Sequence, residues 1–211
     1  MTVQNFFNYQ FNNNYNNKDD YFVNSTNLNA YNLLTKNNFD QNIFLFGPKK
    51  SGKSHLLNIW KKNNKAIIFN NNFNEIINFK KNIAIDNVFI NKSEEEIFHI
   101  INHCNTFNLK ILITSSIDIL NYKYLLPDLI SRLKSFYHIK IDQPDEEMCK
   151  IFLTKLFYEK QIIIKNKEIF DYIFLRVNRT YYDIYIIVEK LDKLSLEKKR
   201  QLTIPLIKEI L

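Results

Sequence analysis

Residues 47–54 carry the clearest chemical pattern in the chain, the octapeptide Gly-Pro-Lys-Lys-Ser-Gly-Lys-Ser. It fits G-x-x-x-x-G-K-[ST], in which glycines let backbone N–H groups wrap phosphate oxygens. In this pattern Lys53 reaches the β and γ phosphates, and Ser54 offers its hydroxyl to Mg²⁺. Average usage would place about fifteen glycines in a chain of this length, yet both of the two present belong to this loop. We therefore expect a P-loop whose nucleotide-binding residues are Gly47, Pro48, Lys49, Lys50, Ser51, Gly52, Lys53 and Ser54.

A carboxylate follows the apolar stretch Ile-Ala-Ile at 83–85. A P-loop protein needs such a group at the end of a neighbouring strand to hold Mg²⁺, so Ser54 and Asp86 are the expected metal-binding pair. The next residue is Asn87, where many such ATPases carry an acid that polarises the attacking water. Because an amide cannot accept a proton in the same way, we expect nucleotide binding with weak or absent ATP hydrolysis by this chain.

Hydroxyl side chains end another apolar stretch, at Thr114, Ser115 and Ser116. Carboxyl ends of parallel strands meet at one edge of a sheet, so these hydroxyls are expected to face the P-loop crevice. Ser115 is the candidate sensor of the γ-phosphate. Ordinary strand-end hydroxyls without such a role are the alternative.

Short apolar runs separated by helical patterns indicate the elements that must position these residues. Near-continuous apolar strands are typical of a parallel sheet buried on both faces. Five strands are expected, at 42–46, 65–70, 82–86, 109–115 and 136–141. Helices are expected between them, at 54–63, 73–80 and 93–105, the last beginning with a capping box of Ser93 and Glu96. This alternation predicts an α/β fold with a five-stranded parallel sheet.

The strand pattern stops after Pro144, and only helical patterns follow. They cover 145–160, 167–177, 181–199 and 204–211, and begin near the capping residues Asp145, Asn166, Thr180 and Thr203. We therefore expect a nucleotide-binding α/β domain at 21–143 and a small all-α lid at 144–211. Residues 1–20, which are rich in Asn and show no helical or strand period, are expected to form a flexible arm.

Composition limits the classes of function. Lys and Arg total 29 against 22 Asp and Glu, a net charge of +7, but Lys and Asn are abundant throughout, so contact with nucleic acid stays open. Neither a run of 18 apolar residues nor a signal-peptide pattern occurs, so a cytoplasmic protein without a membrane segment is expected. The two isolated cysteines do not form a disulfide framework or a metal-ligand pattern.

Several stretches together resemble the DnaA family of AAA+ ATPases, and within it the short DnaA-like regulators of the Hda type. Residues 52–57, Gly-Lys-Ser-His-Leu-Leu, are similar to the family's G-K-[ST]-H-L-L. Tyr-Phe-Val at 21–23, followed by Asn27 and Ala30, resembles the segment that packs against adenine. The resemblance covers about residues 20–211 and implies a P-loop AAA+ domain with a helical lid. It adds to the nucleotide-binding residues Tyr21, Val23, His55 and Arg179, the last as a sensor arginine.

Residues 126–133, Leu-Pro-Asp-Leu-Ile-Ser-Arg-Leu, are close to the P-D-L-x-S-R-L box of these regulators. In the family this arginine is a finger inserted into a neighbouring subunit's nucleotide site, so the resemblance assigns Arg132 to catalysis in trans. The implied protein carries ADP or ATP with Mg²⁺. Together with the sliding clamp, it stimulates ATP hydrolysis by the replication initiator DnaA and so regulates chromosomal replication initiation negatively.

The resemblance also implies the DNA polymerase sliding clamp as a partner. Gln4, Phe6 and Phe7 are the candidate clamp-binding residues, although aromatic residues stand where leucines are usual in the family. A disordered tail without a ligand is the alternative. The chain ends with the lid pattern, and the stretch 70–82 is short. No sequence-specific DNA binding is therefore expected.

Two other functions stay open from the sequence. A self-contained P-loop ATPase or small phosphotransferase would turn over ATP without a partner. A DnaA-like assembly or loading factor would bind DNA with an affinity that falls steeply with salt. The resident nucleotide and the choice between a monomer and a homodimer are also open.

Overall fold

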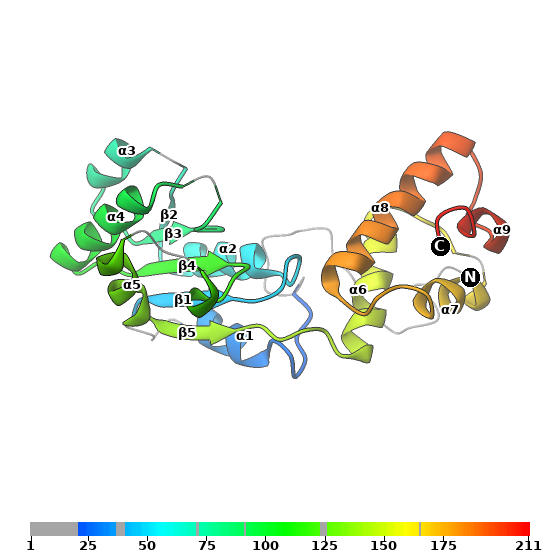
Figure 1. Ribbon diagram of the computed structural model, residues 1–211, viewed down its shortest axis with the longest axis horizontal. Helices are drawn as coiled ribbons and strands as arrows, with labels where there is room; N and C mark the ends of the chain where they lie inside the picture. Colours follow the sequence, from blue (N-terminus) through cyan, green and yellow to red (C-terminus); the bar gives the residue numbers. More distant parts are fainter. Residues whose placement is uncertain (1–20, 37–40, 71, 91, 123–125, 165) are drawn as a thin grey trace. The chain divides into compact units, whose positions relative to one another are not determined.

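The computed structural model describes residues 21–36, 41–70, 72–90, 92–122, 126–164 and 166–211. They belong to two compact units (Figure 1). One unit includes the described residues up to Asp142, and the other includes those from Gln143 to Leu211. In these described parts, no helix is both long and apolar enough to cross a membrane.

The first unit contains a five-stranded sheet in which every neighbouring pair of strands is parallel. The strand order is β2-β3-β4-β1-β5. The strands are β1 (Ile43–Phe46), β2 (Ile67–Ile68), β3 (Ile83–Ile85), β4 (Ile111–Ser115) and β5 (Tyr137–Lys140). The predicted α/β fold with a five-stranded parallel sheet is therefore confirmed. Each strand is shorter than its apolar run because the flanking residues enter the connections.

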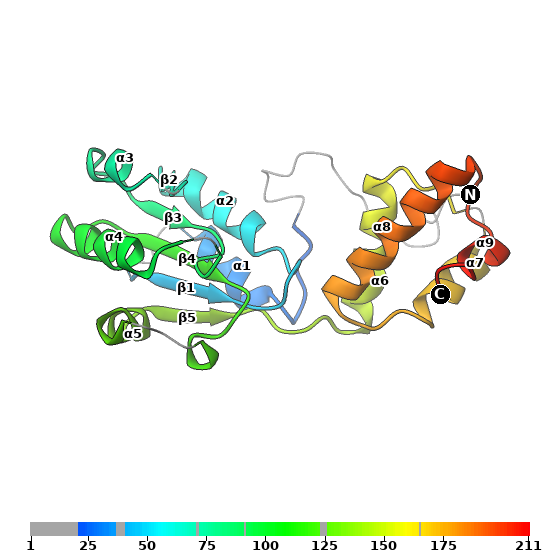
Figure 2. The ribbon, with the colours of Figure 1, turned by 45° about the horizontal axis from the view of Figure 1, so that its top comes forward.

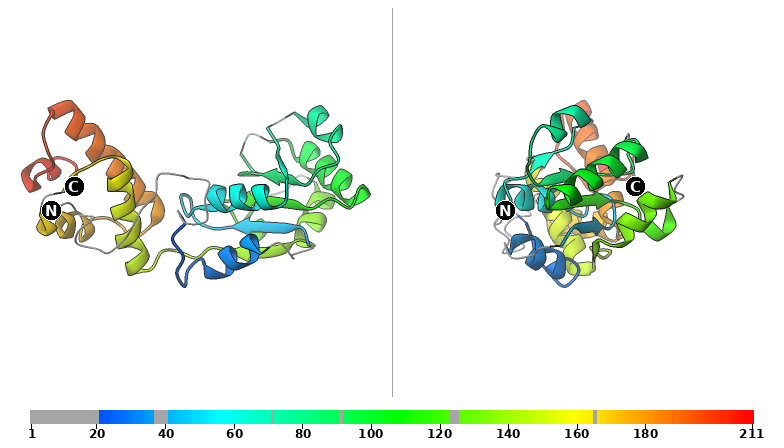
Figure 3. Two further views of the ribbon diagram at one scale, coloured as in Figure 1. Left: turned by 180° about the vertical axis from the view of Figure 1, so that it is seen from behind. Right: turned by 90° about the vertical axis from the view of Figure 1, so that its left-hand side faces the viewer.

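Apolar side chains leave β1 toward both faces of the sheet. Ile43 and Leu45 pack in one cluster with residues of α1 (Leu28–Thr35) and α2 (Lys53–Asn63). Phe44 packs in another cluster with residues of α4 (Glu94–Thr106) and α5 (Pro127–Lys134). Seen from behind (Figure 3), α1 and α2 lie in front of the strands. Successive side chains point to opposite faces of a strand, so the continuous apolar run of β1 fits a sheet covered on both sides.

No helix is predicted from the sequence at α1 or α5. Both have eight residues, and a short apolar period is easily assigned to a loop between two stronger patterns. The remaining helix of this unit is α3 (Phe73–Ile77), and a 3-10 turn, η3, covers Ile119–Asn121. In α4 the expected capping box is wrong, because the Ser93 side chain makes no capping hydrogen bond.

The second unit is entirely helical. It consists of α6 (Glu146–Glu159), α7 (Lys167–Phe174), α8 (Tyr181–Lys198) and α9 (Ile204–Ile207). Figure 2 shows α6 and α8 side by side, and buried residues of both helices share one core with Phe170 of α7 and Ile207 of α9. The predicted all-α architecture of this part of the chain is therefore confirmed.

Three of the expected caps of this unit are present. The side chains of Asp145, Asn166 and Thr180 accept hydrogen bonds from backbone N–H groups in the first turns of α6, α7 and α8. Such bonds satisfy donors that a helix cannot pair internally. Thr203 precedes α9 but makes no such bond, so that cap is wrong.

Candidate nucleotide-binding site

The P-loop connects β1 to α2, as its sequence pattern requires. Gly52 has φ +85°, a left-handed conformation that favours glycine. A Cβ atom there would lie 2.7 Å from Cε2 of Tyr21, and a Cβ on Gly47 would lie 2.8 Å from the Ile141 carbonyl oxygen. A side chain at either glycine would therefore clash, because the loop lies against Ile141 on one side and Tyr21 on the other.

Lys53, the first residue of α2, is buried at the centre of this loop. Its Nζ donates hydrogen bonds to the carbonyl oxygens of Gly47 (2.9 Å) and Pro48 (2.6 Å). Burial lowers the pKa of Lys53 to about 8, although the negative charge of Asp86 favours the charged form. The amine therefore lies inside the loop where phosphate oxygens would replace its carbonyl partners.

Asp86 follows β3 and joins the P-loop to the neighbouring strand. Its Oδ2 accepts a hydrogen bond from the Ser54 hydroxyl (2.7 Å), and its Oδ1 accepts one from the Thr114 hydroxyl (2.5 Å). Carboxylate and hydroxyl oxygens are the hard ligands that Mg²⁺ prefers. Ser54 and Asp86 thus fit a magnesium ion bound together with nucleotide phosphates. Ser51 Oγ, buried in the same loop, has no hydrogen-bond partner among the described residues.

Asn87 lies in a left-handed turn with φ 47°, a conformation that Asn adopts more readily than most residues. Its backbone N–H donates to Oγ1 of Thr114 (2.9 Å). Lys92 spans this turn, and its Nζ donates to the carbonyl oxygen of Asp86 (2.8 Å). Burial lowers the pKa of Lys92, against the influence of the Asp86 charge. Asn87, the residue after Asp86, thus lies in a turn that the hydrogen bond from Lys92 stabilises.

The hydroxyls at the end of β4 have different partners. Thr114 contacts Asp86 directly, whereas the Ser115 hydroxyl donates to the Ile117 carbonyl oxygen (2.6 Å) and accepts from the Ile117 N–H (2.9 Å). Ser115 is therefore engaged within its own loop, and its role as a sensor stays a prediction. Of the three hydroxyls predicted at this edge, Thr114 is the one that contacts Asp86. Successive strand residues point to opposite faces, but which of them meets Asp86 depends on the register of β3 and β4.

An open hollow of about 410 Å³ lies beside Asp86. The groups on its wall that can contact an anion or a cation include the Ser54 hydroxyl, the Asp86 carboxylate and the Lys92 amine. The other lining residues are Leu57, Asn58, Ile68, Phe69 and Asn70. There is space here for phosphate oxygens and a hydrated metal ion next to the predicted metal-binding pair.

The segment beginning at Tyr21 packs over the start of α2. The Tyr21 ring stacks on Tyr31 with centroids 5.8 Å apart, and meets the ring of His55 edge-on at 5.4 Å. Asn27 holds the segment in place, because its side chain donates to the Phe22 carbonyl oxygen and accepts from the Asn24 N–H. Tyr21 and His55 thus lie together at the P-loop, and their contact with adenine stays a prediction. Val23 lies half-buried in the same segment.

Arg132 lies on α5 and is half-buried. Its Cζ is 5.0 Å from the ring centroid of Phe98 on α4, the geometry of a cation–π contact. The proposed role of this arginine requires a second subunit, so its action in trans stays a prediction.

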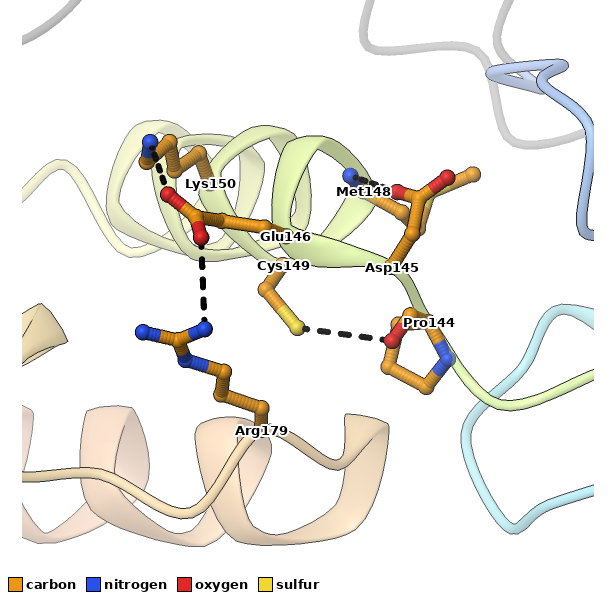
Figure 4. A network of polar contacts seen from close by, with 7 residues as sticks. All are labelled: Pro144, Asp145, Glu146, Met148, Cys149, Lys150 and Arg179. Atoms are coloured by element: carbon orange, nitrogen blue, oxygen red, sulfur yellow. Dashed lines mark hydrogen bonds and ion pairs between the residues drawn. The ribbon is translucent and has the colours of Figure 1, made fainter.

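Arg179 lies in the helical unit, just before α8 (Figure 4). Its Nη1 forms an ion pair with Oε2 of Glu146 at 3.2 Å, and Lys150 pairs with the other carboxylate oxygen at 2.6 Å. The hydrogen bond from Lys150 is the main cause that lowers the pKa of Glu146. Nucleotide contact by Arg179 stays a prediction and would require it to leave, or share, this exposed carboxylate.

Three of the residues predicted from the sequence, Gln4, Phe6 and Phe7, lie outside the described residues. The predicted arm at 1–20 as a whole also lies outside them. Its contact with a sliding clamp stays a prediction.

Comparison with known proteins relates both units to replication initiators. The family described as "Hda, lid domain" matches residues 158–211. The chromosomal replication initiator protein DnaA of Buchnera aphidicola subsp. Cinara cedri is 29% identical over 209 residues, covering 84% of this chain and 47% of that protein. The chain therefore spans about half the length of this curated relative.

Solved structures agree on the fold. Domain III of the Thermotoga maritima replication initiation protein DnaA superposes with a TM-score of 0.72 at 20% identity, covering 96% of this chain and 98% of that one. AMPPCP-bound DnaA from Aquifex aeolicus superposes with a TM-score of 0.64 at 22% identity, covering 86% of this chain and 67% of that one. This chain thus has the architecture of an initiator's nucleotide-binding domain.

Proposed function

We propose that this chain, a DnaA-related AAA+ protein of the Hda type, is a nucleotide-bound negative regulator of chromosomal replication initiation. The observation that carries the proposal is a hydrogen-bonded Ser54–Asp86 pair at the P-loop, followed by an amide where many such ATPases carry an acid. Ser54, the last residue of the P-loop, donates a hydrogen bond to Asp86, and Asn87 is the residue after Asp86. This combination favours a protein that holds nucleotide and acts on a partner's ATP.

The bound ligand in this proposal is ADP or ATP with Mg²⁺. Backbone N–H groups of the P-loop and Lys53 would bind the phosphates, and Ser54 and Asp86 would hold the metal. Tyr21, Val23 and His55 would line the adenine side, and Arg179 of the lid would contact the nucleotide. The likeness to an initiator that binds the ATP analogue AMPPCP supports a nucleotide rather than a free phosphate.

Arg132 would act on the neighbouring initiator. An arginine placed against the γ-phosphate in trans stabilises the charge of the transition state, and such fingers raise hydrolysis by about 10³- to 10⁵-fold. Hydrolysis would convert the initiator DnaA to its ADP form. In this proposal the regulator's own nucleotide acts as a structural ligand.

The sliding clamp would bring the regulator to DNA. Gln4, Phe6 and Phe7 would bind it as an extended segment, with aromatic side chains as anchors. The proposal places the protein in the cytoplasm and does not require it to read a DNA sequence or to form a homodimer.

The test measures ATP hydrolysis by the cognate initiator with the clamp loaded on DNA, with and without this chain. The chain alone is assayed in parallel. We expect stimulation that needs the clamp and is lost in Arg132→Ala. The matched control is Arg200→Ala, which removes an exposed arginine from the second unit. Full stimulation by Arg132→Ala would refute action through this arginine, and rapid turnover by the chain alone would instead support a self-contained ATPase.

A further inference from the structure

The helix that carries Arg132 is attached to α4 at both of its ends. At its start, the carboxylate of Glu94 accepts a hydrogen bond from the backbone N–H of Leu126, the residue before α5 (3.1 Å). Near its end, the ring of Phe98 lies under the guanidinium of Arg132. Glu94 and Phe98 are four residues apart on α4, so they lie on the same helix face. One face of α4 thus supports α5 along its length.

The backbone at Arg132 is held in place independently of its side chain. Leu129 and Leu133, on the inner face of α5, are fully buried in the core. The Arg132 carbonyl oxygen accepts from both the N–H (3.1 Å) and the hydroxyl (2.7 Å) of Ser135, which ends the helix. The remaining freedom of Arg132 is therefore in its long side chain, where the Phe98 ring makes contact.

The partner of this guanidinium is a ring instead of a carboxylate. Among the described residues, the ion pairs include none made by Arg132, whereas Arg179 pairs with Glu146. A carboxylate would orient the arginine but would also compete with any incoming phosphate. An aromatic face orients a guanidinium without neutralising it. The five N–H donors of Arg132 then stay available for a bidentate contact with phosphate oxygens.

We propose that Phe98 is a positioning residue that holds the Arg132 guanidinium in place for a phosphate presented by a partner subunit. This inference rests on the proposed function, because it concerns how the same arginine reaches its target. Side-chain ordering before docking reduces the entropy that is lost when the complex forms. Phe98 therefore acts through Arg132 and needs no contact with the nucleotide.

The test uses the same assay of initiator ATP hydrolysis, with the full chain, clamp and DNA. Phe98→Leu keeps an apolar side chain but removes the aromatic face, and we expect stimulation to fall by about 2- to 10-fold, as for loss of a partly exposed cation–π contact. Phe98→Trp retains an aromatic face and should restore most of the stimulation. The double variant Phe98→Leu/Arg132→Ala should show no loss beyond that of Arg132→Ala.

Two measurements separate positioning from a general loss of structure. The affinity of each variant for its own nucleotide should be unchanged, since Phe98 is not among the P-loop contacts described above. Glu94→Gln, which weakens the other attachment of α5 without changing the ring, should give a smaller loss. If Phe98→Leu is unstable, Phe98→Met takes its place, because its flexible side chain fills space without an aromatic face and should show the same loss of stimulation.

The outcomes distinguish this inference from the proposed function. Loss of stimulation in Arg132→Ala with full stimulation in Phe98→Leu would overturn the positioning role alone. Full stimulation in Arg132→Ala would overturn the proposed function and the inference with it. An equal loss in Phe98→Leu and Phe98→Trp would show that the ring fills space and does not orient the arginine.

Discussion

Protonation of Lys53 should make nucleotide affinity depend on pH. In the nucleotide-free chain, burial lowers the pKa of this amine to about 8. Phosphate oxygens close to the Nζ atom would favour its charged form and raise the pKa again. Binding above pH 8 must therefore take up a proton, so affinity should fall as the pH rises.

The size of the effect follows from the fraction of free chain in which Lys53 is already charged. At pH 7 that fraction is close to one, whereas at pH 9 it is about one tenth for a pKa of about 8. The Kd for ADP with Mg²⁺ should therefore be about tenfold higher at pH 9 than at pH 7. The same shift affects the free energy of unfolding without nucleotide. Between pH 8 and 10.5 the unfolded chain binds the Lys53 proton and the folded chain does not, so the free energy of unfolding should rise by about 3 kcal/mol as the pH increases over this range.

Isothermal titration calorimetry of ADP at pH 7, 8 and 9, in buffers of different ionisation enthalpy, measures both the Kd and the proton uptake. Lys53→Arg is the matched control, because arginine stays charged throughout this range and its Kd should not change with pH. Lys92→Arg tests the neighbouring lysine, whose pKa is also lowered. A wild-type Kd that is constant from pH 7 to 9, or a pH dependence that disappears only in Lys92→Arg, would refute the reasoning.

Three further substitutions test the loop, the metal-binding pair and the missing acid. Gly52→Ala should destabilise the chain by about 1–3 kcal/mol in chemical denaturation, because its φ is left-handed and the new Cβ would meet the Tyr21 ring. Asp86→Asn should weaken ATP binding by about tenfold or more in the presence of Mg²⁺ but little in EDTA, as measured by fluorescence titration. Asn87→Asp, which keeps a residue tolerant of φ 47°, should raise phosphate release by the chain alone by about 10- to 100-fold.

Each of these substitutions has a result that counts against its premise. Unchanged stability of Gly52→Ala would show that the loop can move away from Tyr21. Equal weakening of ATP binding with and without Mg²⁺ in Asp86→Asn would mean that Asp86 organises the loop and does not hold the metal. No gain in Asn87→Asp would place the barrier to hydrolysis outside this position.

The spacing of a few residues was enough to predict a phosphate-binding loop. The P-loop needs consecutive residues only, so Gly47, Gly52, Lys53 and Ser54 could be assigned from local order. Asp86 was found for a similar reason, because it ends an apolar strand that had to be parallel to β1. The alternation of strands and helices likewise predicted the sheet and the helical lid, since binary patterns follow the periods of the elements themselves.

Contacts between segments distant in the sequence were decided by the tertiary structure alone. Strand register brings Thr114, and not Ser115, to Asp86, and packing of the first described segment places Tyr21 against Gly52. The contact between Phe98 and Arg132 joins helices whose residues are far apart in the chain. Local patterns specify which face of an element is apolar, but side-chain partners across elements depend on register and packing that no single segment contains.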